Sequence, residues 1–509
     1  MAVVQPRQSE VTAIFHHQPR LGRDIELPTQ QSSRRDFLRS SYNGLGMLAL
    51  AGMLADELDL APAAAQAAAT AISDAHHKAK AKHCIFLFMA GGVSQMDTFD
   101  PKPELDRLAG GRLPQVAGVS GALAGKLDFP HVVLPSPFKF HQYGESGRWV
   151  AELFPGIGSC VDEMAFIHGI MVDNENHGPA TSHATTGHVL SGSPSIGSWV
   201  TYGLGSPSAD LPSYVVIHDP RGLPMNSGAA WGNGYLPANF QGTVLRPTGT
   251  PILNLERPPG VSRQQQRREL DLLQWLNARH GEGRPIDSEL EARIEAYELA
   301  YRMQQAAPEL VELDDETDAT QQMYGLNNPQ TAHFGRQCLL ARRMVERGVR
   351  YTMLVHGVQI THHSWDDHGD SEGRMRKHAA EVDQPVAALL NDLKQRGLLE
   401  ETLVVWASEM GRTPFVPGRD LSEKPGRDHN QYGLVMWMAG GDVKAGATVG
   451  ATDPFGIRAA EQPIPIRDVH ATLLHLLGLD DSRLRYLHAG RYRQLTDIGG
   501  RVLTEIVNA

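Results

Sequence analysis

The sequence predicts an α/β fold, a mostly parallel sheet with helices on both faces. Nearly continuous apolar runs are typical of strands buried on both faces, and four occur, at residues 83–89, 351–355, 402–407 and 434–439. Amphipathic patterns at 334–347 and 379–396 alternate with these runs, and each is followed by a glycine, Gly348 or Gly397, that would cap a helix. Alternating strands and helices indicate a parallel sheet covered on both sides.

The composition narrows the class of protein. The 509 residues carry 47 Lys+Arg and 58 Asp+Glu, a formal net charge of −11, and 41 % are hydrophobic. This is ordinary globular composition, and the acidic balance argues against a nucleic-acid partner, which needs a basic face. Three cysteines exclude a disulfide scaffold and any four-cysteine metal site. The 23 histidines are conspicuous, and they cluster.

The first 67 residues have the order of an export signal. A twin-arginine motif at 33–38 is followed by a short apolar run at 45–55 and by an alanine-rich segment at 61–67. The run is shorter than the ~20 residues that span a bilayer. We therefore expect residues 1–67 to be a twin-arginine signal peptide and disordered N-terminus, with the twin-arginine translocase as the export partner. The mature protein is expected to be periplasmic or otherwise extracytoplasmic, without a membrane span.

Residues 68–509 are expected to form one domain with an insertion. Between about 205 and 330 the character of the chain changes, from Pro- and Gly-rich segments to a charged helical stretch at 264–305. We interpret this segment as an insertion that caps the sheet.

A glycine-rich loop follows the first predicted strand. Gly91 and Gly92 would let backbone N–H groups approach an anion, with Ser94 beside them, and Asp97 or Asp100 could bind a cation. The alternative is a tight turn with an aspartate cap. The spacing of a dinucleotide-binding loop is absent.

A histidine- and hydroxyl-rich segment occupies 177–188. If a helix begins near Pro179, a hydroxyl in its first turn lies in the positive field of the helix N-terminus, so Ser182 or Thr181 is a candidate nucleophile. His177 and His183 could then serve as acid, base or ligand. The alternative is a small-residue helix packed under the sheet.

The densest set of metal-ligand side chains is at 362–368, which contains three His and two Asp. These N and O donors suit zinc or a similar divalent ion, and the alternative is a solvated polar loop.

Further candidates follow the strand predicted at 402–407. Glu409 stands at the strand end, His429 comes later, and Arg412 and Arg427 could clamp an anion. The arginines could instead be structural.

With these motifs in order, the chain resembles the domain-of-unknown-function 1501 family of exported bacterial proteins over nearly its whole mature length. The matching segments are 91–103, the histidine-rich stretch ending at 190–192, 365–370, 407–414, 426–430 and 468–479. That family is similar to the alkaline phosphatase and sulfatase superfamily.

The superfamily resemblance implies a three-layer sandwich and a specific site. Its nucleophile opens a helix about ten residues before a Thr-Gly pair, and counting back from Gly192 reaches Ser182. Its first metal takes an Asp, a nearby His and a distant His, which here are Asp366, His368 and His429.

The resemblance assigns a second metal to Glu409 and Asp97, with two departures. Met410 stands where a His or Asn ligand is expected, and Ala90 stands where an Asp closes the first strand, so Asp97 would have to replace it. The cysteine- or serine-based nucleophile motif of the sulfatases is missing.

These observations lead to one main hypothesis: a metal-dependent hydrolase of phosphate or sulfate esters, acting on small-molecule or carbohydrate substrates. Ser182 would attack, His177 would assist, and Arg412 would stabilise charge beside a divalent metal, zinc first and calcium or another ion next. The alternatives are a non-catalytic metal- or glycan-binding envelope protein and a one-metal isomerase or transferase. The expected substrate contacts are Gly91, Gly92, Ser94, His183 and Arg427.

Overall fold

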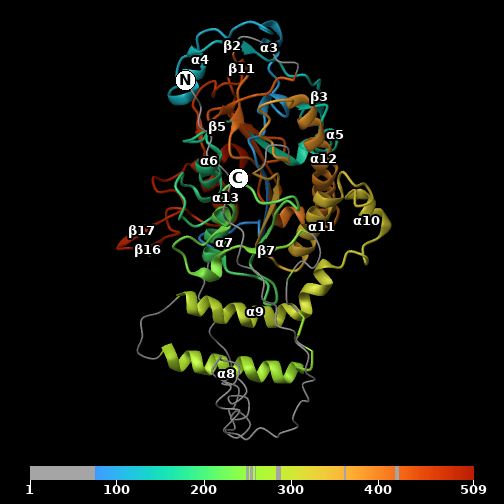
Figure 1. Cartoon of the computed structure of the whole chain (residues 1–509), viewed down its shortest axis with the longest axis vertical. Coiled ribbons are helices and arrows are strands. Elements are labelled where there is room, and N and C mark those ends of the chain that lie inside the picture. The colour runs from blue at the N-terminus through green and yellow to red at the C-terminus, as the bar shows by residue number, and fades with distance from the viewer. Residues whose placement is uncertain are drawn as a thin grey trace, which may run out of the picture.

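The computed structural model describes residues 75–508, except for 248–251, 253–255, 258, 282–287, 360–362 and 419–423. At its centre lies a nine-stranded sheet in the order β14-β5-β13-β9-β1-β8-β6-β7, with β15 also paired to β5 (Figure 1). The strands are β1 (His83–Met89), β5 (Met164–Met171), β6 (Tyr214–Ile217), β7 (Thr243–Leu245), β8 (Tyr351–His356), β9 (Thr402–Ala407), β13 (Leu434–Ala439), β14 (Thr448–Val449) and β15 (Ile464–Pro465).

The prediction of a mostly parallel sheet is confirmed. β1 pairs in parallel with β8 and β9, β6 pairs in parallel with β7 and β8, and β14 and β15 run parallel to β5. β13 is the exception, antiparallel to both neighbours, β5 and β9. A strand buried on both faces has the same apolar composition in either direction, so the run at 434–439 could not reveal this.

Alternate residues of the strands face two separate cores, which makes the fold a three-layer sandwich. Ile85 and Leu87 belong to one core, and Phe86 and Phe88 belong to the other. The first core is completed by α11 (Ala332–Glu346) and α12 (Ser371–Gln395), beside the short α5 (Pro155–Gly158). The second is completed by α6 (His177–Thr186), α7 (Ile196–Leu204) and α13 (Ile466–Leu476), on the opposite side in Figure 1.

Both predicted helices exist, and one is longer than expected. α11 agrees with the pattern at 334–347, and Gly348 and Gly397 follow the two helices with φ of +81° and +70°. α12 begins at Ser371, eight residues before the expected 379. Its first two turns are mostly polar, with Met375 and His378 facing inward, so the apolar periodicity is weak there.

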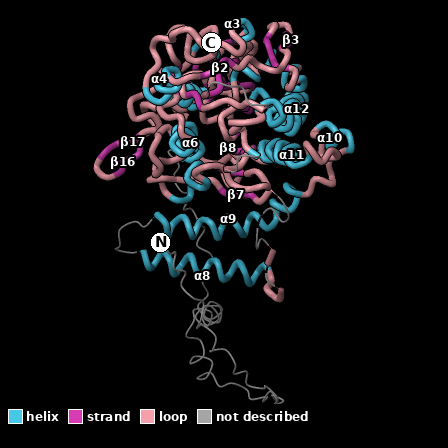
Figure 2. Tube along the Cα trace, turned by 45° about the horizontal axis from the view of Figure 1, so that its top comes forward, coloured by secondary structure: helices cyan, strands magenta, loops and turns pink. Residues whose placement is uncertain are grey.

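One part of the segment 205–330 belongs to the central sheet, and another part projects from the body of the protein. β6 and β7 fall within it and belong to the central sheet. α8 (Arg263–Gly281) and α9 (Ser288–Val311) project from the body as a helical pair (Figure 2), and α10 (Asp318–Met323) follows. The projecting part is therefore smaller than the insertion that the composition indicates.

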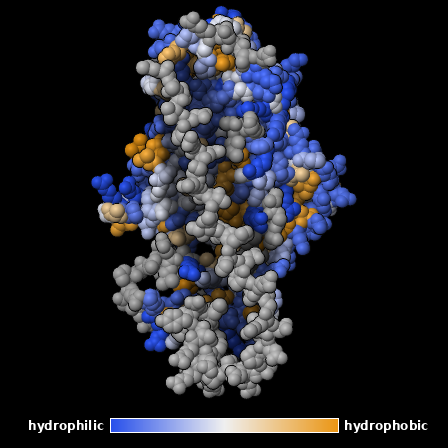
Figure 3. All heavy atoms as spheres, viewed as in Figure 1, coloured by the Kyte–Doolittle hydropathy of each residue, from blue (hydrophilic) through white to orange (hydrophobic). Residues whose placement is uncertain are grey.

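Smaller elements complete the described chain: α3 (Pro103–Arg107), α4 (Gly121–Asp128), β2 (His131–Val133), β3 (Phe140–Tyr143), β4 (Arg148–Ala151), β10 (Gly411–Arg412), β11 (Phe415–Pro417), β12 (His429–Asn430), β16 (Tyr486–His488) and β17 (Arg491–Arg493). Where described residues are visible in Figure 3, hydrophilic residues predominate and the hydrophobic patches are small and separate. Among the described helices, none is both long and apolar enough to cross a membrane. The expected signal at 1–67 lies outside the described residues.

Gly91 lets the loop after β1 contact the loop after β8. Its φ is +122°, and a Cβ there would lie 2.5 Å from the backbone N of Trp365 and 2.6 Å from that of Asp366. No side chain fits, because the blocking atoms are backbone. This close approach joins the two loops at the edge of the sheet where the polar motifs gather.

Gly91→Ala should therefore destabilise the fold more than an alanine at a glycine in open space. Gly397, with φ +70° and no atom within 4 Å of a built Cβ, is the matched control. We expect Gly397→Ala to cost about 1 kcal/mol of unfolding free energy, and Gly91→Ala about 3 kcal/mol or more, because displaced backbone adds to the strain. Urea unfolding measures both. Equal losses would contradict the close contact.

Candidate metal centre

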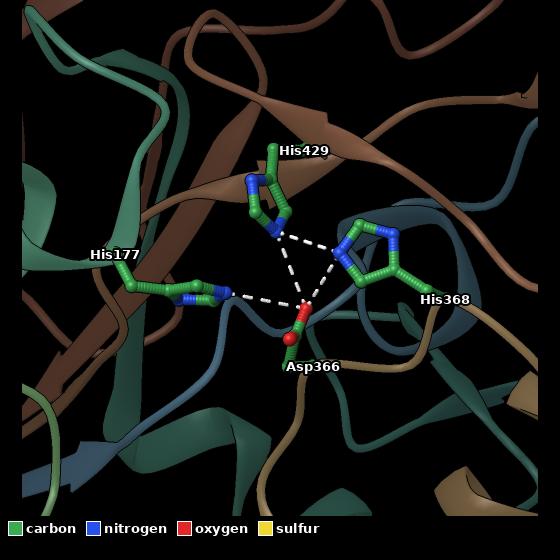
Figure 4. Close-up of side chains that lie close together, drawn as sticks. All are labelled: His177, Asp366, His368 and His429. Atoms are coloured by element: carbon green, nitrogen blue, oxygen red, sulfur yellow. Dashed lines mark hydrogen bonds and ion pairs between the residues drawn. The ribbon is translucent and has the colours of Figure 1, made fainter. Parts of the chain in front are cut away.

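Four side chains from three distant segments of the chain converge on one point: His177, Asp366, His368 and His429 (Figure 4). Each offers one ligand atom, and these atoms all lie within 4.8 Å of one another. The sequence predicts Asp366, His368 and His429 as one ligand set, and the structure brings these three together. His177, expected beside a serine nucleophile, is the fourth member.

The topology of the sheet explains the convergence. His177 is the first residue of α6, just after β5, and Asp366 and His368 come after β8. β5 and β8 end at the same edge, because β5 and β9 both run antiparallel to β13 and β9 is parallel to β1 and β8. His429, in β12, precedes β13, whose reversed direction puts its start at that edge. Ligands of α/β sheets bind at this edge.

Four of the distances within the cluster are close to those between the ligand atoms of a tetrahedral metal site. Asp366 Oδ1 lies 3.2 Å from His177 Nε2, 2.9 Å from His368 Nε2 and 3.2 Å from His429 Nε2. His368 Nε2 and His429 Nε2 are 2.9 Å apart. Ligand atoms around a tetrahedral zinc ion, with bonds of about 2.0–2.1 Å, lie ~3.3 Å from one another. His177 Nε2 is buried, and Asp366 Oδ1 is its one partner among the described residues, so the residues fit a divalent metal.

The charges of the cluster favour an ionised Asp366. Burial alone would raise the pKa of Asp366, but hydrogen bonds from the three histidines and the charge of Arg412 hold it well below its usual range. Burial lowers the pKa of His177, but the carboxylates of Asp366 and Glu409 outweigh it and raise the pKa to about 9. Since histidine ligates metals in its neutral form, a metal ion bound here would displace a proton.

Glu409, which the resemblance assigns to a second metal, is bonded within the protein and orients His177. His177 Nδ1 lies 3.0 Å from Glu409 Oε1, which also accepts a hydrogen bond from Gly91 N at 2.7 Å. Ser408 Oγ donates to the other oxygen at 3.2 Å. A carboxylate on the second nitrogen of a ligating histidine fixes the ring and raises its basicity.

Arg412 positions the site through hydrogen bonds within the protein, so its guanidinium is not free to bind an anion. Its guanidinium donates to Asp366 Oδ1 at 2.8 Å, to the carbonyl of Gly92 at 2.8 Å and to the carbonyl of Gly91. Trp365 O accepts a further bond at 3.2 Å. The side chain is 2 % exposed. Arg412 therefore binds the loops after β1 and β8 to each other.

The loop after β1 is also occupied by internal bonds, which corrects three further expectations. Asp97 accepts two hydrogen bonds from Arg427, at 2.6 and 3.0 Å, and one from Ser94 Oγ at 2.6 Å. Arg427 gives its other bonds to backbone carbonyls and is 1 % exposed. Asp97 is thus a partner of arginine and not a metal ligand, and Ser94 and Arg427 are not exposed to a substrate.

In the expected anion cradle at Gly91 and Gly92, the N–H of Gly91 is already bonded within the protein. Gly91 N donates to Glu409, and both glycine carbonyls accept from Arg412. Asp100, the other cation candidate of this loop, pairs with Lys102 at 2.7 Å.

Ser182 does not occupy the place expected of a nucleophile. α6 begins at His177, so its first turn carries His-Gly-Pro-Ala, and Ser182 lies in the second turn. Its hydroxyl is buried, 3.5 Å from Thr186 Oγ1. His183 contacts Asp173: the backbone N of Asp173 donates a hydrogen bond to His183 Nδ1 at 3.2 Å. The helix starts two residues before Pro179, and its N-cap residue, Asn176, forms no side-chain capping hydrogen bond.

The role of His177 could have been found from one more strand. β5, at 164–171, was not among the predicted strands, because His168 and Gly169 interrupt its apolar run. Once that strand is recognised, His177 stands at a strand end like the other motifs. His362, the first histidine of the predicted cluster, lies outside the described residues.

Fold and site together define a three-layer α/β protein with a candidate metal centre of three histidines and one aspartate at the edge of its sheet. The chain belongs to the family described as "Protein of unknown function (DUF1501)", whose model matches residues 81–507. The resemblance stated from the motifs is thereby confirmed. No curated protein matches the sequence.

The solved structures similar to the chain include a member of the alkaline phosphatase superfamily, a phosphonate monoester hydrolase and a sulfatase. A protein in the alkaline phosphatase superfamily from Vibrio parahaemolyticus is 13 % identical, with 92 % of this chain and 80 % of that chain covered and a TM-score of 0.34. A phosphonate monoester hydrolase from Silicibacter pomeroyi is 12 % identical, with coverage of 69 % and 71 % and a TM-score of 0.32. A sulfatase from Pseudoalteromonas sp. is 13 % identical, with coverage of 84 % and 72 % and a TM-score of 0.29.

Glu409→Gln should weaken metal binding without removing the ligand set. The amide keeps the shape of the side chain but loses the charge that polarises His177, so we expect a dissociation constant for zinc ~10-fold to 100-fold higher. Glu400→Gln, on the surface, is the matched control and should leave the affinity unchanged. Competition titration against a chromophoric chelator measures both. Equal affinities of the two variants would show that Glu409 does not support a metal ligand.

Proposed function

We propose that the protein is an exported, metal-dependent hydrolase of phosphate or sulfate esters with one zinc ion as its cofactor. The observation that carries the proposal is the convergence of four donor atoms within 4.8 Å of one another. Asp366 Oδ1 lies 2.9–3.2 Å from the three histidine nitrogens, and a carboxylate lies behind one of the histidines. Three histidines and one carboxylate are ligands that zinc accepts.

A divalent ion held by these residues would supply Lewis-acid activation of water or of an ester oxygen. The side chain of His368 is 48 % exposed, whereas those of the other three ligands are 14–18 % exposed. A substrate would therefore approach from the His368 side. Glu409 holds the ring of His177, and Arg412 holds the Asp366 carboxylate in place.

The attacking group in this proposal is water and not Ser182. The serine hydroxyl is buried and bonded within α6, whereas the solvent-exposed side of the cluster admits water. The reaction then needs no covalent intermediate on the chain, as in the one-metal alternative.

A second candidate function is metal binding without catalysis. Structural zinc sites have four protein ligands, and catalytic sites commonly have three with an open position. The four donors in this cluster support the metal-binding form of the envelope-protein alternative.

Metal content and turnover separate these candidates. Protein purified without chelator should contain one zinc per chain and hydrolyse a phenyl phosphate or phenyl sulfate. His429→Ala should lose the metal and lower turnover ~100-fold or more, whereas Ser182→Ala should keep both. His141→Ala, at an exposed histidine, controls for the substitution.

Two outcomes would change the assignment. Full zinc content without turnover on any phosphate or sulfate ester would favour the binding candidate. Loss of turnover in Ser182→Ala at unchanged zinc content would instead restore a serine nucleophile.

Export rests on the twin-arginine motif, where the receptor recognises Arg34 and Arg35. Replacing both with Lys removes the planar guanidinium groups. We expect the double variant to stay in the cytoplasm with its leader uncleaved, as cell fractionation would show. Normal processing of the double variant would contradict twin-arginine export.

A further inference from the structure

A second group of histidines and carboxylates is buried beside the metal centre, between β8 and the helices α11 and α12. The donor atoms of Asp219, His333 and His356 lie within 4.8 Å of one another, and so do those of His356, His378 and Glu381. Composition alone would make this a second metal site. The hydrogen bonds of His356, the member common to both sets, indicate a different role.

Both ring nitrogens of His356 are already in use. Trp365 Nε1 lies 3.0 Å from His356 Nδ1, and an indole N–H can only donate, so Nδ1 accepts and carries no proton. The proton of the neutral ring is then on Nε2, which donates to Glu381 Oε2 at 2.8 Å. Neither nitrogen has a free lone pair for a metal ion. The ring is a link between a carboxylate and an indole.

Glu381 is a fixed, charged acceptor at one end of this link. Arg221 donates to its other oxygen at 3.0 Å and pairs with Asp219 at 2.6 Å. Burial would raise the pKa of Glu381, but His356 and Arg221 hold it at about 2. The ionised carboxylate therefore determines which nitrogen of His356 carries the proton.

Trp365, at the other end, directly precedes the metal ligand Asp366. Its indole is 1 % exposed and packs against His378, with ring centroids 5.2 Å apart. Its backbone N donates to Ala90 O at 3.0 Å, and its carbonyl accepts from Arg412 at 3.2 Å. The side chain and the backbone of Trp365 are thus both held by hydrogen bonds. The backbone position of the next residue, Asp366, is fixed as a result.

We propose that His356 is a positioning residue of the metal centre: it holds the Trp365 indole through Nδ1, and through Trp365 it sets the position of the Asp366 carboxylate. This inference rests on the proposed function, because it assigns the ligand role to Asp366. It adds a buried chain, Arg221–Glu381–His356–Trp365, that joins the helix layer to the centre. Ligands need such support, since small displacements cost metal affinity.

Two substitutions at His356 separate its two hydrogen bonds. In His356→Asn the amide oxygen takes the place of Nδ1 and can accept from Trp365, but the bond to Glu381 is lost. In His356→Gln the longer amide reaches toward Glu381, and the acceptor for Trp365 is lost. Each variant removes one bond of the same buried residue, so their costs in stability should be similar.

The readout is the zinc dissociation constant of the purified chain, with urea unfolding of the same samples. We expect His356→Gln to weaken zinc binding ~10-fold to 100-fold and His356→Asn to change it less than ~3-fold. Trp365→Phe should match His356→Gln, and adding it to His356→Gln should cause no further loss. His131→Gln, at a buried histidine bonded to the backbone of Phe129, is the control and should leave zinc affinity unchanged.

Three outcomes of these measurements would contradict the positioning role of His356, each for a different reason. Equal zinc affinities in the Asn and Gln variants, at equal stability, would overturn the positioning role while leaving the metal centre intact. Two zinc ions in the wild type, with one lost in both variants, would overturn it in favour of a second metal ligated by His356. A wild type that binds no zinc would overturn both this inference and the proposed function.

Discussion

The candidate centre depends on one oxygen atom, Asp366 Oδ1, which contacts all the other members of the cluster. Three histidine nitrogens lie within 3.2 Å of it, and Arg412 donates to it at 2.8 Å. A buried carboxylate surrounded by so many donors stays ionised, because each contact stabilises the charge that burial alone would suppress. The loops that present these groups lie next to separate strands, so the pairing of those strands brings the partners of this oxygen together.

Around that oxygen, the guanidinium groups of two buried arginines connect loops of the protein and are not free to bind a substrate. Arg412 bonds the carbonyls of Gly91 and Gly92, and Arg427 holds Asp97. Each guanidinium is almost fully buried, so its desolvation has to be offset by several hydrogen bonds at once. In the sequence, Arg412 and Arg427 are candidates for binding an anion. In the structure, their hydrogen bonds instead hold together the loops at the edge of the sheet.

Sequence patterns predicted what depends on local residue order. The strand at 83–89 and the helix that ends before Gly348 follow from apolar periodicity and a capping glycine, and both are present. Asp366 and His368 could be recognised as candidate ligands because they are close together in the chain. His429, distant in sequence, was assigned to them through the family resemblance. The role of a side chain that depends on which distant partner it faces was not predictable, and Glu409 is the clearest case. A carboxylate at a strand end can ligate a metal or orient a histidine, and only the three-dimensional position of His177 decides between them.

Crystals of the chain loaded with zinc, measured at the zinc absorption edge, would test the centre most directly. The anomalous map should show one strong peak with ~2.0–2.2 Å bonds to His177 Nε2, Asp366 Oδ1, His368 Nε2 and His429 Nε2. A peak bound instead by Asp97 and Glu409, or no peak among these four side chains, would contradict the assignment.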